Sequence, residues 1–186
     1  MRKLLFGINL TLDGCCDHTK GIPNEEVHEY FTQLTLDAGE LLYGRKTYEL
    51  MVPFWPDIAK NNSSSNKAMN DFAQAFNAVN RITLVSQSLQ AVESKNTHII
   101  NNNLKDEVLK LKQQEGKNIL TGGVDVPSQL LQLGLIDEFH IVIHPIIVGE
   151  GRRLFDNISL TDYPELNLVD STVFKSGHVA LRYLKN

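Results

Sequence analysis

The chain has few cysteines and no long apolar run, and both absences narrow the class of protein. Its two cysteines, Cys15 and Cys16, are adjacent, and neighbouring cysteines seldom bond to each other. Because no third cysteine is present, we expect reduced thiols in a cytoplasmic protein. No apolar stretch is long enough to span a bilayer. The N-terminal apolar stretch is interrupted by Asn9 and Thr11, and no small-residue cleavage site follows it, so we expect no signal peptide.

The chain also lacks an excess of positive charge. Its net charge is −4 at pH 7 and its pI is about 5.8. Proteins that bind nucleic acid or anionic membranes carry a basic surface, so we expect neither partner. The chain has 186 residues, of which 42% are hydrophobic, which is enough for one well-buried core. No biased linker divides the sequence, and we therefore expect one domain spanning residues 1–186.

Strands alternate with helices along most of the sequence. Apolar runs predict strands at 3–12, 41–43, 81–86, 97–100, 118–121 and 137–148. Helical spacing and end signals predict helices at 24–39, 44–53, 67–79, 104–114 and 126–133. The segment 53–66 is predicted to be a surface loop, and a Ser-Gly turn joins two last strands, 166–174 and 178–184, in a hairpin. This order predicts an α/β protein with a mixed, mostly parallel sheet and helices on both faces.

The residues around Gly44 predict an anion-binding site. Gly44 lets the chain turn sharply after the strand at 41–43, and Arg45, Lys46 and Thr47 fall in the first turn of the next helix. Backbone N–H groups in a first turn have no helical partner and favour an anion. The three side chains add a guanidinium fork, a point charge and a hydroxyl, which suit phosphate. The alternative is a solvated helix start with two ordinary surface cations.

Two further strand ends carry polar or flexible residues. Gly122 and Gly123 join the strand at 118–121 to a helix, which lets a ligand approach the backbone, although such a pair is also typical of a tight turn. Ser86 ends the strand at 81–86. Ligands bind at the carboxyl ends of strands in open α/β sheets. We therefore expect these two strand ends to converge with the end of the strand at 41–43, directly before Gly44. The chain has no P-loop, and no G-x-G-x-x-G in a strand–helix setting.

Two acids, Asp13 and Glu150, also follow strands. An acid in a cleft orients a polar ring or serves proton transfer, above all where burial raises its pKa. The alternative for each is an acid in a surface turn. His140 and His144 share one face of the strand at 137–148, and without a third ligand we interpret them as structural.

The loop that contains Cys15, Cys16, Asp17 and His18 invites comparison with metal sites. Adjacent cysteines do not easily both bind one ion, and a single histidine supplies too few ligands. We therefore expect no metal there, and we expect the loop to line the mouth of a pocket.

The chain resembles the dihydrofolate reductase-like superfamily, and within it the branch of the riboflavin-biosynthesis reductase domain. The resemblance covers nearly the full length, and the segments that carry it agree in order and spacing: Thr11-Leu12-Asp13-Gly14, Leu42-Tyr43-Gly44-Arg45-Lys46-Thr47-Tyr48-Glu49, Trp55-Pro56, Gly122-Gly123, Gln129-Leu130-Leu131, Gly134-Leu135-Ile136-Asp137-Glu138, Pro145, Gly149-Glu150-Gly151 and Leu154-Phe155. It implies a three-layer dihydrofolate reductase-like fold with a mixed, mostly parallel central sheet and a C-terminal antiparallel hairpin. It also implies an NADPH-dependent oxidoreductase that transfers a hydride to a small heterocycle of the pterin/folate or aminopyrimidine type.

The resemblance also implies roles for particular residues. The cofactor would lie along the strand ends, where it would contact Gly44, Arg45, Lys46, Thr47, Ser86, Gly122 and Gly123. Arg45 would hold the adenosine 2′-phosphate, and the paired glycines would meet the pyrophosphate. In the riboflavin branch, acids that match Asp13 and Glu150 face the substrate and the nicotinamide.

Some features depart from the family pattern and leave the substrate open. Dihydrofolate reductases place a pterin-binding acid early in the first helix, after a proline, and here Glu25 is its nearest counterpart. Lys20 is the one candidate near Asp13 for a ribityl phosphate. Two other classes stay open: a non-catalytic nucleotide-binding module that retains the fold, and a metal sensor that uses Cys15, Cys16 and His18. We also expect a homodimer, because the strand at 139–148 and the terminal hairpin offer surface that one chain does not cover, and members of this branch often dimerise there.

Overall fold

An eight-stranded sheet runs through the computed structural model, which describes residues 1–21, 23–160 and 163–186. The strands are β1 (Leu4–Thr11), β2 (Ala38–Gly44), β3 (Arg81–Val85), β4 (Thr97–Ile100), β5 (Asn118–Thr121), β6 (Glu138–His144), β7 (Leu166–Val173) and β8 (Val179–Lys185). Their order in the sheet is β4-β3-β2-β5-β1-β6-β8-β7. Neighbours from β4 to β6 pair in parallel, whereas β8 is antiparallel to both β6 and β7. The predicted mixed, mostly parallel sheet with a C-terminal hairpin is confirmed.

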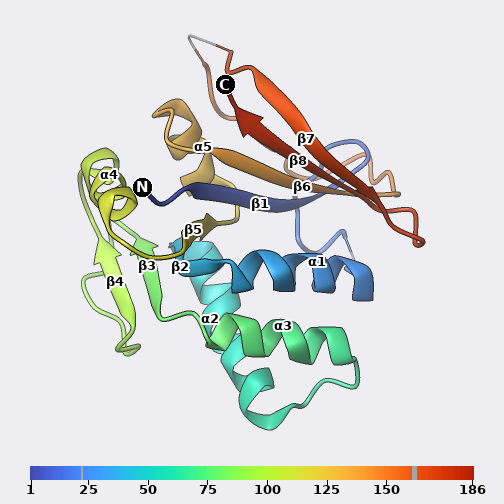
Figure 1. Ribbon diagram of the computed structural model, residues 1–186, viewed down its shortest axis with the longest axis horizontal. Coiled ribbons are helices and arrows are strands. Elements are labelled where there is room, and N and C mark those ends of the chain that lie inside the picture. Colours follow the sequence, from blue (N-terminus) through green and yellow to red (C-terminus); the bar gives the residue numbers. More distant parts are fainter. Residues whose placement is uncertain (22, 161–162) are drawn as a thin grey trace.

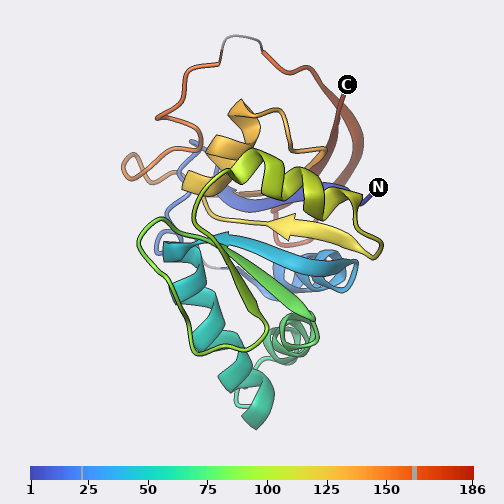
Figure 2. The same ribbon diagram turned by 90° about the vertical axis from the view of Figure 1, so that its left-hand side faces the viewer.

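Helices cover both faces of this sheet. They are α1 (Glu25–Leu36), α2 (Arg45–Asn61), α3 (Lys67–Asn77), α4 (Leu104–Gln113) and α5 (Asp125–Gln132). Figure 1 shows α1, α2 and α3 on one side and α4 and α5 on the other, and Figure 2 shows the same layers from the side. Side chains alternate along β1, so Leu5 joins the core under α1 and α3 while Leu4 and Phe6 join the core under α4 and α5.

The prediction that the second helix ends near Pro53 is wrong, and of the surface loop predicted at 53–66 only residues 62–66, between α2 and α3, lie outside the helices. Helix α2 continues through Pro53 and Pro56 to Asn61. A proline inside a helix costs about 3 kcal/mol. Here the Trp55 ring packs against Phe72 of α3 with their centroids 4.5 Å apart, and buried residues further along α2 also contact α3. This tertiary packing outweighs the tendency of the two prolines to end the helix.

Two predicted boundaries also need correction. Strand β6 ends at His144 rather than at residue 148, because Pro145 has no N–H group with which to continue the ladder. Gly39 does not close α1, which ends at Leu36, but lies within β2. A Cβ on Gly39 would lie 3.2 Å from the Lys117 Cβ, so glycine here permits a close approach of backbone.

The C-terminal hairpin leaves one strand uncovered. Every residue of β7 is exposed, and Leu168 and Val173 expose 53% and 75% of their surface. A second copy of the chain would cover such a strand, and the homodimer stays a prediction. Across the described residues, none of the helices combines the length and apolar character needed to cross a membrane.

Candidate functional site

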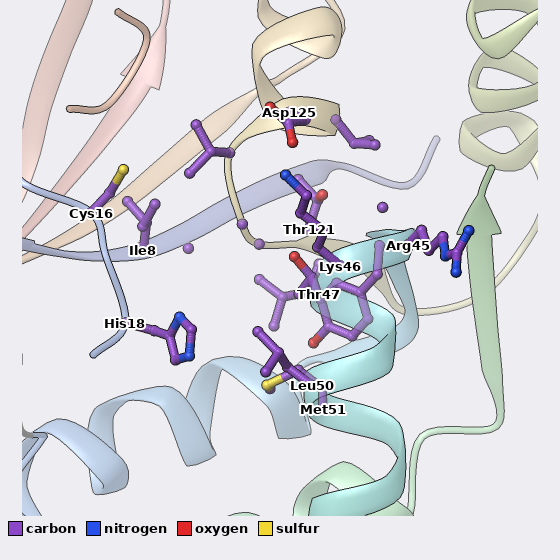
Figure 3. A pocket seen from close by; sticks show the side chains of 18 of the residues that line it. Ile8, Cys16, His18, Arg45, Lys46, Thr47, Leu50, Met51, Thr121 and Asp125 are labelled. Atoms are coloured by element: carbon purple, nitrogen blue, oxygen red, sulfur yellow. The ribbon is translucent and has the colours of Figure 1, made fainter. Parts of the chain in front are cut away.

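A cavity of about 1320 Å³ opens at the carboxyl ends of the parallel strands. Residues at the ends of β2, β3 and β5 line it together with parts of β1, α1 and α2. The predicted convergence of the strand ends at Tyr43, Val85 and Thr121 is therefore confirmed. Figure 3 shows this cavity, with Thr121 and the first turn of α2 on one side and Cys16 and His18 on the other.

The first turn of α2 presents its N–H groups without a side-chain cap. Gly44 is the N-cap residue and forms no capping hydrogen bond, so the turn suits an anionic ligand. Arg45, Lys46 and Thr47 all line the cavity. The Arg45 side chain is half exposed, and it donates to Glu49 Oε1 at 2.6 Å and to Ser88 Oγ at 3.3 Å.

The start of α5 lies directly against the start of α2. Gly123 has a φ of +84°, and a Cβ there would overlap the Thr47 hydroxyl oxygen. A Cβ on Gly44 would lie only 2.9 Å from Val126 Cγ2. The glycines therefore allow two helix N-termini to meet at one point of the cavity. Helix α5 also lacks a side-chain cap at its N-cap residue, Val124.

One acid at this junction is neutralised by a neighbour. Asp125 lies in the first turn of α5, where its charge would repel an anionic ligand. Its Oδ1 is 2.7 Å from Nη1 of Arg152, and this hydrogen bond raises the pKa of Arg152 above its usual range. Both residues line the cavity, so the pair brings no net charge to the junction of the two helix starts.

The ends of β3 and β4 form a polar side of the cavity. Ser86 is buried, and its Oγ accepts a hydrogen bond from the Leu89 N–H at 3.2 Å. The Asn101 side chain donates to the carbonyl oxygens of Ser86 and Leu89, at 2.6 and 2.7 Å, and so fixes the loop after β3. The sequence analysis missed Asn101, although a run of three asparagines directly after a predicted parallel strand was a usable signal.

Asp13 lies beside the cavity rather than among the residues that line it. Its carboxylate accepts hydrogen bonds from Thr11 Oγ1 at 2.6 Å, from the Gly149 N–H at 2.9 Å and from the Val148 N–H at 3.3 Å. These bonds lower the pKa of Asp13 to about 2, the direction opposite to that which burial would give. The ionised carboxylate therefore ties the end of β1 to the turn that follows β6.

Glu150 also lies outside the cavity lining and is largely exposed. Its Oε1 is 2.5 Å from Lys20 Nζ, and this hydrogen bond lowers the pKa of Glu150. Lys20 is thus engaged by an acid of the same chain. Glu25, the nearest counterpart of a pterin-binding acid, is exposed and accepts a hydrogen bond from Asn66 Nδ2 at 3.3 Å, and it does not line the cavity.

The loop with the two cysteines lines the cavity, as expected. Cys15 packs against Gly151, where a Cβ would lie 2.7 Å from its Sγ. The Cys16 Sγ instead donates to the Arg152 carbonyl at 3.2 Å, so the two thiols have different partners. Within residues 1–21, 23–160 and 163–186, no three His, Cys, Asp or Glu side chains are grouped to hold a metal ion.

Aromatic side chains from three helices line another part of the cavity. Trp55 lies between Phe54 and Phe72, with ring centroids 4.9 and 4.5 Å away, and His28 is 6.2 Å from Trp55. All four rings line the cavity. They form a surface suited to a flat apolar ring. The sequence analysis did not identify it, because Trp55 reaches this place only if α2 continues past Pro53.

Within the described residues, three buried polar atoms of the cavity lining have no hydrogen-bond partner. Asn9 Oδ1, on β1, and His144 Nε2, at the end of β6, belong to neighbouring strands, and the third is Arg152 Nε, whose guanidinium already pairs with Asp125. His144 is only 2% exposed, and burial and the nearby His178 lower its pKa to about 4. His144 therefore lies in the cavity wall, and the structural role that the sequence suggested stays a prediction.

Comparisons with known proteins agree with this geometry. The family described as "RibD C-terminal domain" matches residues 2–180. The uncharacterized protein YyaP of Bacillus subtilis (strain 168) is 31% identical over 98% of this chain and 94% of its own length. The crystal structure of a putative riboflavin biosynthesis protein from Shewanella sp. PV-4 aligns with a TM-score of 0.73 at 21% identity, over 99% of both chains. Dihydrofolate reductase from Enterococcus faecalis, complexed with NADP(H), aligns with a TM-score of 0.65 at 14% identity, over 99% of this chain and 96% of its own. The dihydrofolate reductase-like fold is confirmed.

Proposed function

The chain belongs to the RibD C-terminal domain family, and we propose that it is an NADPH-dependent reductase of a small heterocycle, of the pterin/folate or aminopyrimidine type. The observation that carries this proposal is the meeting of two uncapped helix N-termini, at Gly44 and Val124, in one large cavity. Helix N-termini favour phosphate groups, and a dinucleotide brings several of them.

The residues present fit NADPH. Gly44, Lys46 and Thr47 would hold its phosphates, and Arg45, which is half exposed at the rim, would pair with the 2′-phosphate. Gly122, Gly123 and Ser86 would hold the pyrophosphate and the adjoining part of the cofactor. Gly122 and Gly123 lack Cβ atoms, so the cofactor could approach the protein backbone there. Small-molecule sites usually span about 300–1,000 Å³, and this cavity, at about 1320 Å³, leaves room for a second ring.

The aromatic part of the cavity would hold the substrate ring. Trp55 and Phe72 offer faces and edges for stacking, and His28 adds a polar group beside them. When bound, the cofactor supplies a hydride, and the protein aligns the two rings and excludes water.

For Asp13 and Glu150 we propose orienting roles. Both carboxylates have a lowered pKa and are ionised at neutral pH, so neither is suited to donate a proton. Asp13 would set the position of the strand end beneath the nicotinamide by holding Gly149. Glu150 would fix Lys20 beside the cavity mouth.

The second candidate function is a non-catalytic nucleotide-binding module. The observation that favours it is that Asp13 and Glu150 are both engaged within the chain and lie outside the cavity lining. Such a module would bind NADPH through the same glycines and Arg45 but would reduce no substrate.

The experiment that separates the two functions has a binding part and a turnover part. NADPH binding is measured first by quenching of Trp55 fluorescence, and NADPH oxidation is then followed with dihydrofolate, dihydropterin and diaminouracil derivatives. Oxidation that depends on one of these compounds supports the reductase. Binding without turnover across the panel supports the module, and absence of NADPH binding contradicts both.

We further propose a cytoplasmic homodimer that covers the exposed β7 strand. The proposal is supported by exposed apolar residues along β7, Leu168 and Val173 among them. Sedimentation equilibrium would give a dimer mass for the wild type and a monomer mass for Leu168→Lys. A monomeric wild type would contradict this part of the proposal.

A further inference from the structure

Asn9 and His144 place two unpartnered polar atoms on the same face of the sheet. In the parallel pair of β1 and β6, Asn9 lies opposite Val142 and Thr11 lies opposite His144. Residues two apart on a strand share a face, so Asn9 and His144 are diagonal neighbours, roughly 8 Å apart at the backbone from strand spacing and rise. A buried polar group without a partner costs about 1–3 kcal/mol. Because both residues line the cavity, a ligand can supply the missing partners.

His144 is connected to the protein surface through two further side chains. Its Nδ1 lies 3.3 Å from Nε2 of His178, and the two ring centroids are 4.5 Å apart. The other ring nitrogen of His178, Nδ1, is 3.0 Å from the Ser176 hydroxyl oxygen. Ser176 is exposed in the turn between β7 and β8, so a hydrogen-bonded path leads from solvent to the cavity.

The surface end of this path is held in place by α1. The Glu26 carboxylate accepts hydrogen bonds from the backbone N–H groups of Lys175, at 3.1 Å, and Ser176, at 3.0 Å. Hydrogen bonding by the side chain of Ser176, together with these two backbone bonds, lowers the pKa of Glu26, which is therefore ionised at neutral pH and anchors the turn. The hairpin turn thus has a fixed position relative to the helix that lines the cavity.

We propose that His144 donates the proton that accompanies reduction of the substrate, and that His178 and Ser176 restore that proton from solvent. This inference rests on the proposed reductase function. It adds a catalytic residue that neither Asp13 nor Glu150 can replace, since both are ionised and outside the cavity lining.

The proton and electron balance is complete. The carbon of a substrate C=N or C=O bond accepts a hydride, with its two electrons, from NADPH. The π bond breaks, and its electron pair moves to the nitrogen or oxygen atom. That atom takes the proton from His144 Nε2, His144 Nδ1 takes the proton from His178 Nε2, and His178 Nδ1 takes one from the Ser176 hydroxyl. Water reprotonates Ser176, so each turnover consumes one NADPH and one solvent proton. The relay leaves both imidazole rings protonated on Nδ1. After the product leaves, water in the cavity gives a proton to His144 Nε2, and the Nδ1 protons pass back through His178 and Ser176 to solvent, which restores the starting tautomers with no net gain or loss of protons.

A neutral imidazole suits this transfer. The pKa of His144 is lowered to about 4, so the ring carries no charge at neutral pH. When His178 donates to His144 Nδ1, the single proton of the neutral His144 ring is on Nε2, the ring nitrogen that has no partner among the described residues. As the substrate heteroatom becomes strongly basic, the proton moves to it, and concerted transfer from His178 leaves no charged imidazole ring behind.

The other histidine deep in the cavity lining is not equivalent to His144 as a proton donor. The Nδ1 atom of His28 lies 2.8 Å from the carbonyl oxygen of Asn24, which only accepts hydrogen bonds, so Nδ1 carries the proton. Nε2 of a neutral His28 is then an acceptor. His28 can bind a substrate N–H group, but in this tautomer it has no proton to give to the cavity.

Asn9 limits which substrates fit the cavity. Its Oδ1 can accept a hydrogen bond from a ligand, whereas His144 Nε2–H can donate one. A ring edge that offers an N–H group to Asn9 and a lone pair to His144 satisfies both atoms. Lactam and amidine edges, as in aminopyrimidines and pterins, have this donor and acceptor pattern, whereas a plain hydrocarbon ring leaves both atoms unpaired.

The first test observes His144 directly by nuclear magnetic resonance of the histidine ring nitrogens. Protein saturated with NADP⁺ is titrated with diaminouracil and, separately, with dihydropterin. We expect a neutral, Nε2-protonated His144 at pH 7, and a shift of its Nε2 signal with at least one probe, while the signals of the exposed His98 stay unchanged. A His144 protonated on Nδ1, or an unchanged Nε2 signal with both probes, would overturn the inference.

The second test uses variants. His144→Gln keeps a hydrogen-bonding group but cannot relay a proton, and we expect kcat to fall by about 10²–10⁴-fold with a much smaller change in KM. His178→Phe should lower kcat and enlarge the solvent deuterium isotope effect, and His98→Gln is the matched control that should change neither. NADPH affinity should stay within about twofold in all three, because none of them lies at the phosphate end. An unchanged kcat in His144→Gln would overturn the role of His144 as proton donor. Failure of the wild type to bind NADPH would instead contradict the proposed reductase function.

Discussion

Thr47 and Gly123 lie so close together that a Cβ atom on Gly123 would overlap the Thr47 hydroxyl oxygen. One residue belongs to the first turn of α2 and the other precedes α5. Their contact brings two uncapped helix N-termini to the same part of the cavity, and only a residue without a side chain permits it. This junction is the structural basis for the proposal that the phosphates of the cofactor bind here.

Gly123→Ala is predicted to separate the two helix starts. The added methyl group meets Thr47, and the positive φ of +84° strains any L residue. We expect NADPH affinity to fall by about tenfold or more, which is about 1.4 kcal/mol, measured by fluorescence titration. Gly134→Ala is the control, because its φ of +68° imposes similar backbone strain while its Cβ meets only the end of the Lys185 side chain. Equal NADPH affinity in both variants would contradict the junction's role.

Arg45→Ala is predicted to weaken NADPH binding while leaving NADH binding unchanged. A charge-assisted hydrogen bond contributes about 1.5–3 kcal/mol, so we expect a loss of about tenfold to a hundredfold for NADPH alone. The measurement compares dissociation constants for both cofactors. Lys60→Ala, which removes an exposed cation at the opposite end of α2, should change neither value. Equal losses for NADPH and NADH would show that Arg45 does not contact the 2′-phosphate.

Trp55→Ala is predicted to lower the free energy of unfolding by about 2–4 kcal/mol, because truncating a large packed ring leaves a cavity. Trp55 contacts Phe72 and helps hold α2 against α3 beyond Pro53. Urea unfolding gives the measurement, and Phe54→Ala should cost clearly less, because Phe54 is 49% exposed. Similar small losses in both variants would indicate that α2 does not pack on α3 in this region.

Stability is predicted to fall as the pH is lowered from about 6.5 towards 4. The pKa of His144 is about 4 in the folded protein and near 6.5 in the unfolded chain, so the unfolded state binds more protons in this interval. Burial also lowers the pKa of His140, which adds to the effect. The titratable ring packed against His144 is that of His178. The free energy of unfolding, measured in urea across this pH range, should change less with pH in His144→Gln than in the wild type. An equal pH dependence in both proteins would contradict the lowered pKa of His144.

Local patterns were enough to predict the layers, the hairpin and the helix start at Gly44. The alternation of strands and helices sets the topology, and the topology brings the strand ends at Tyr43, Val85 and Thr121 together. Each of these inferences depends on residues near one another in the sequence or on the order of elements.

Other features depend on contacts between distant residues and were not predictable from local pattern. Asp13 accepts hydrogen bonds from Val148 and Gly149, so its lowered pKa follows from a turn far along the chain. Helix α2 passes Pro53 because α3 supplies a surface for it. His144 enters the cavity wall because of the register between β1 and β6, and the sequence gives only its alternation with His140.

The most direct measurement of the central claim is the comparison of NADPH and NADH binding to the wild-type protein by quenching of Trp55 fluorescence. Trp55 lies in the cavity lining and is the single tryptophan of the chain. We expect saturable quenching by both cofactors, with NADPH bound at least about tenfold more tightly, a difference of about 1.4 kcal/mol. Absence of binding by either cofactor would contradict the assignment of the cavity as a nicotinamide dinucleotide site.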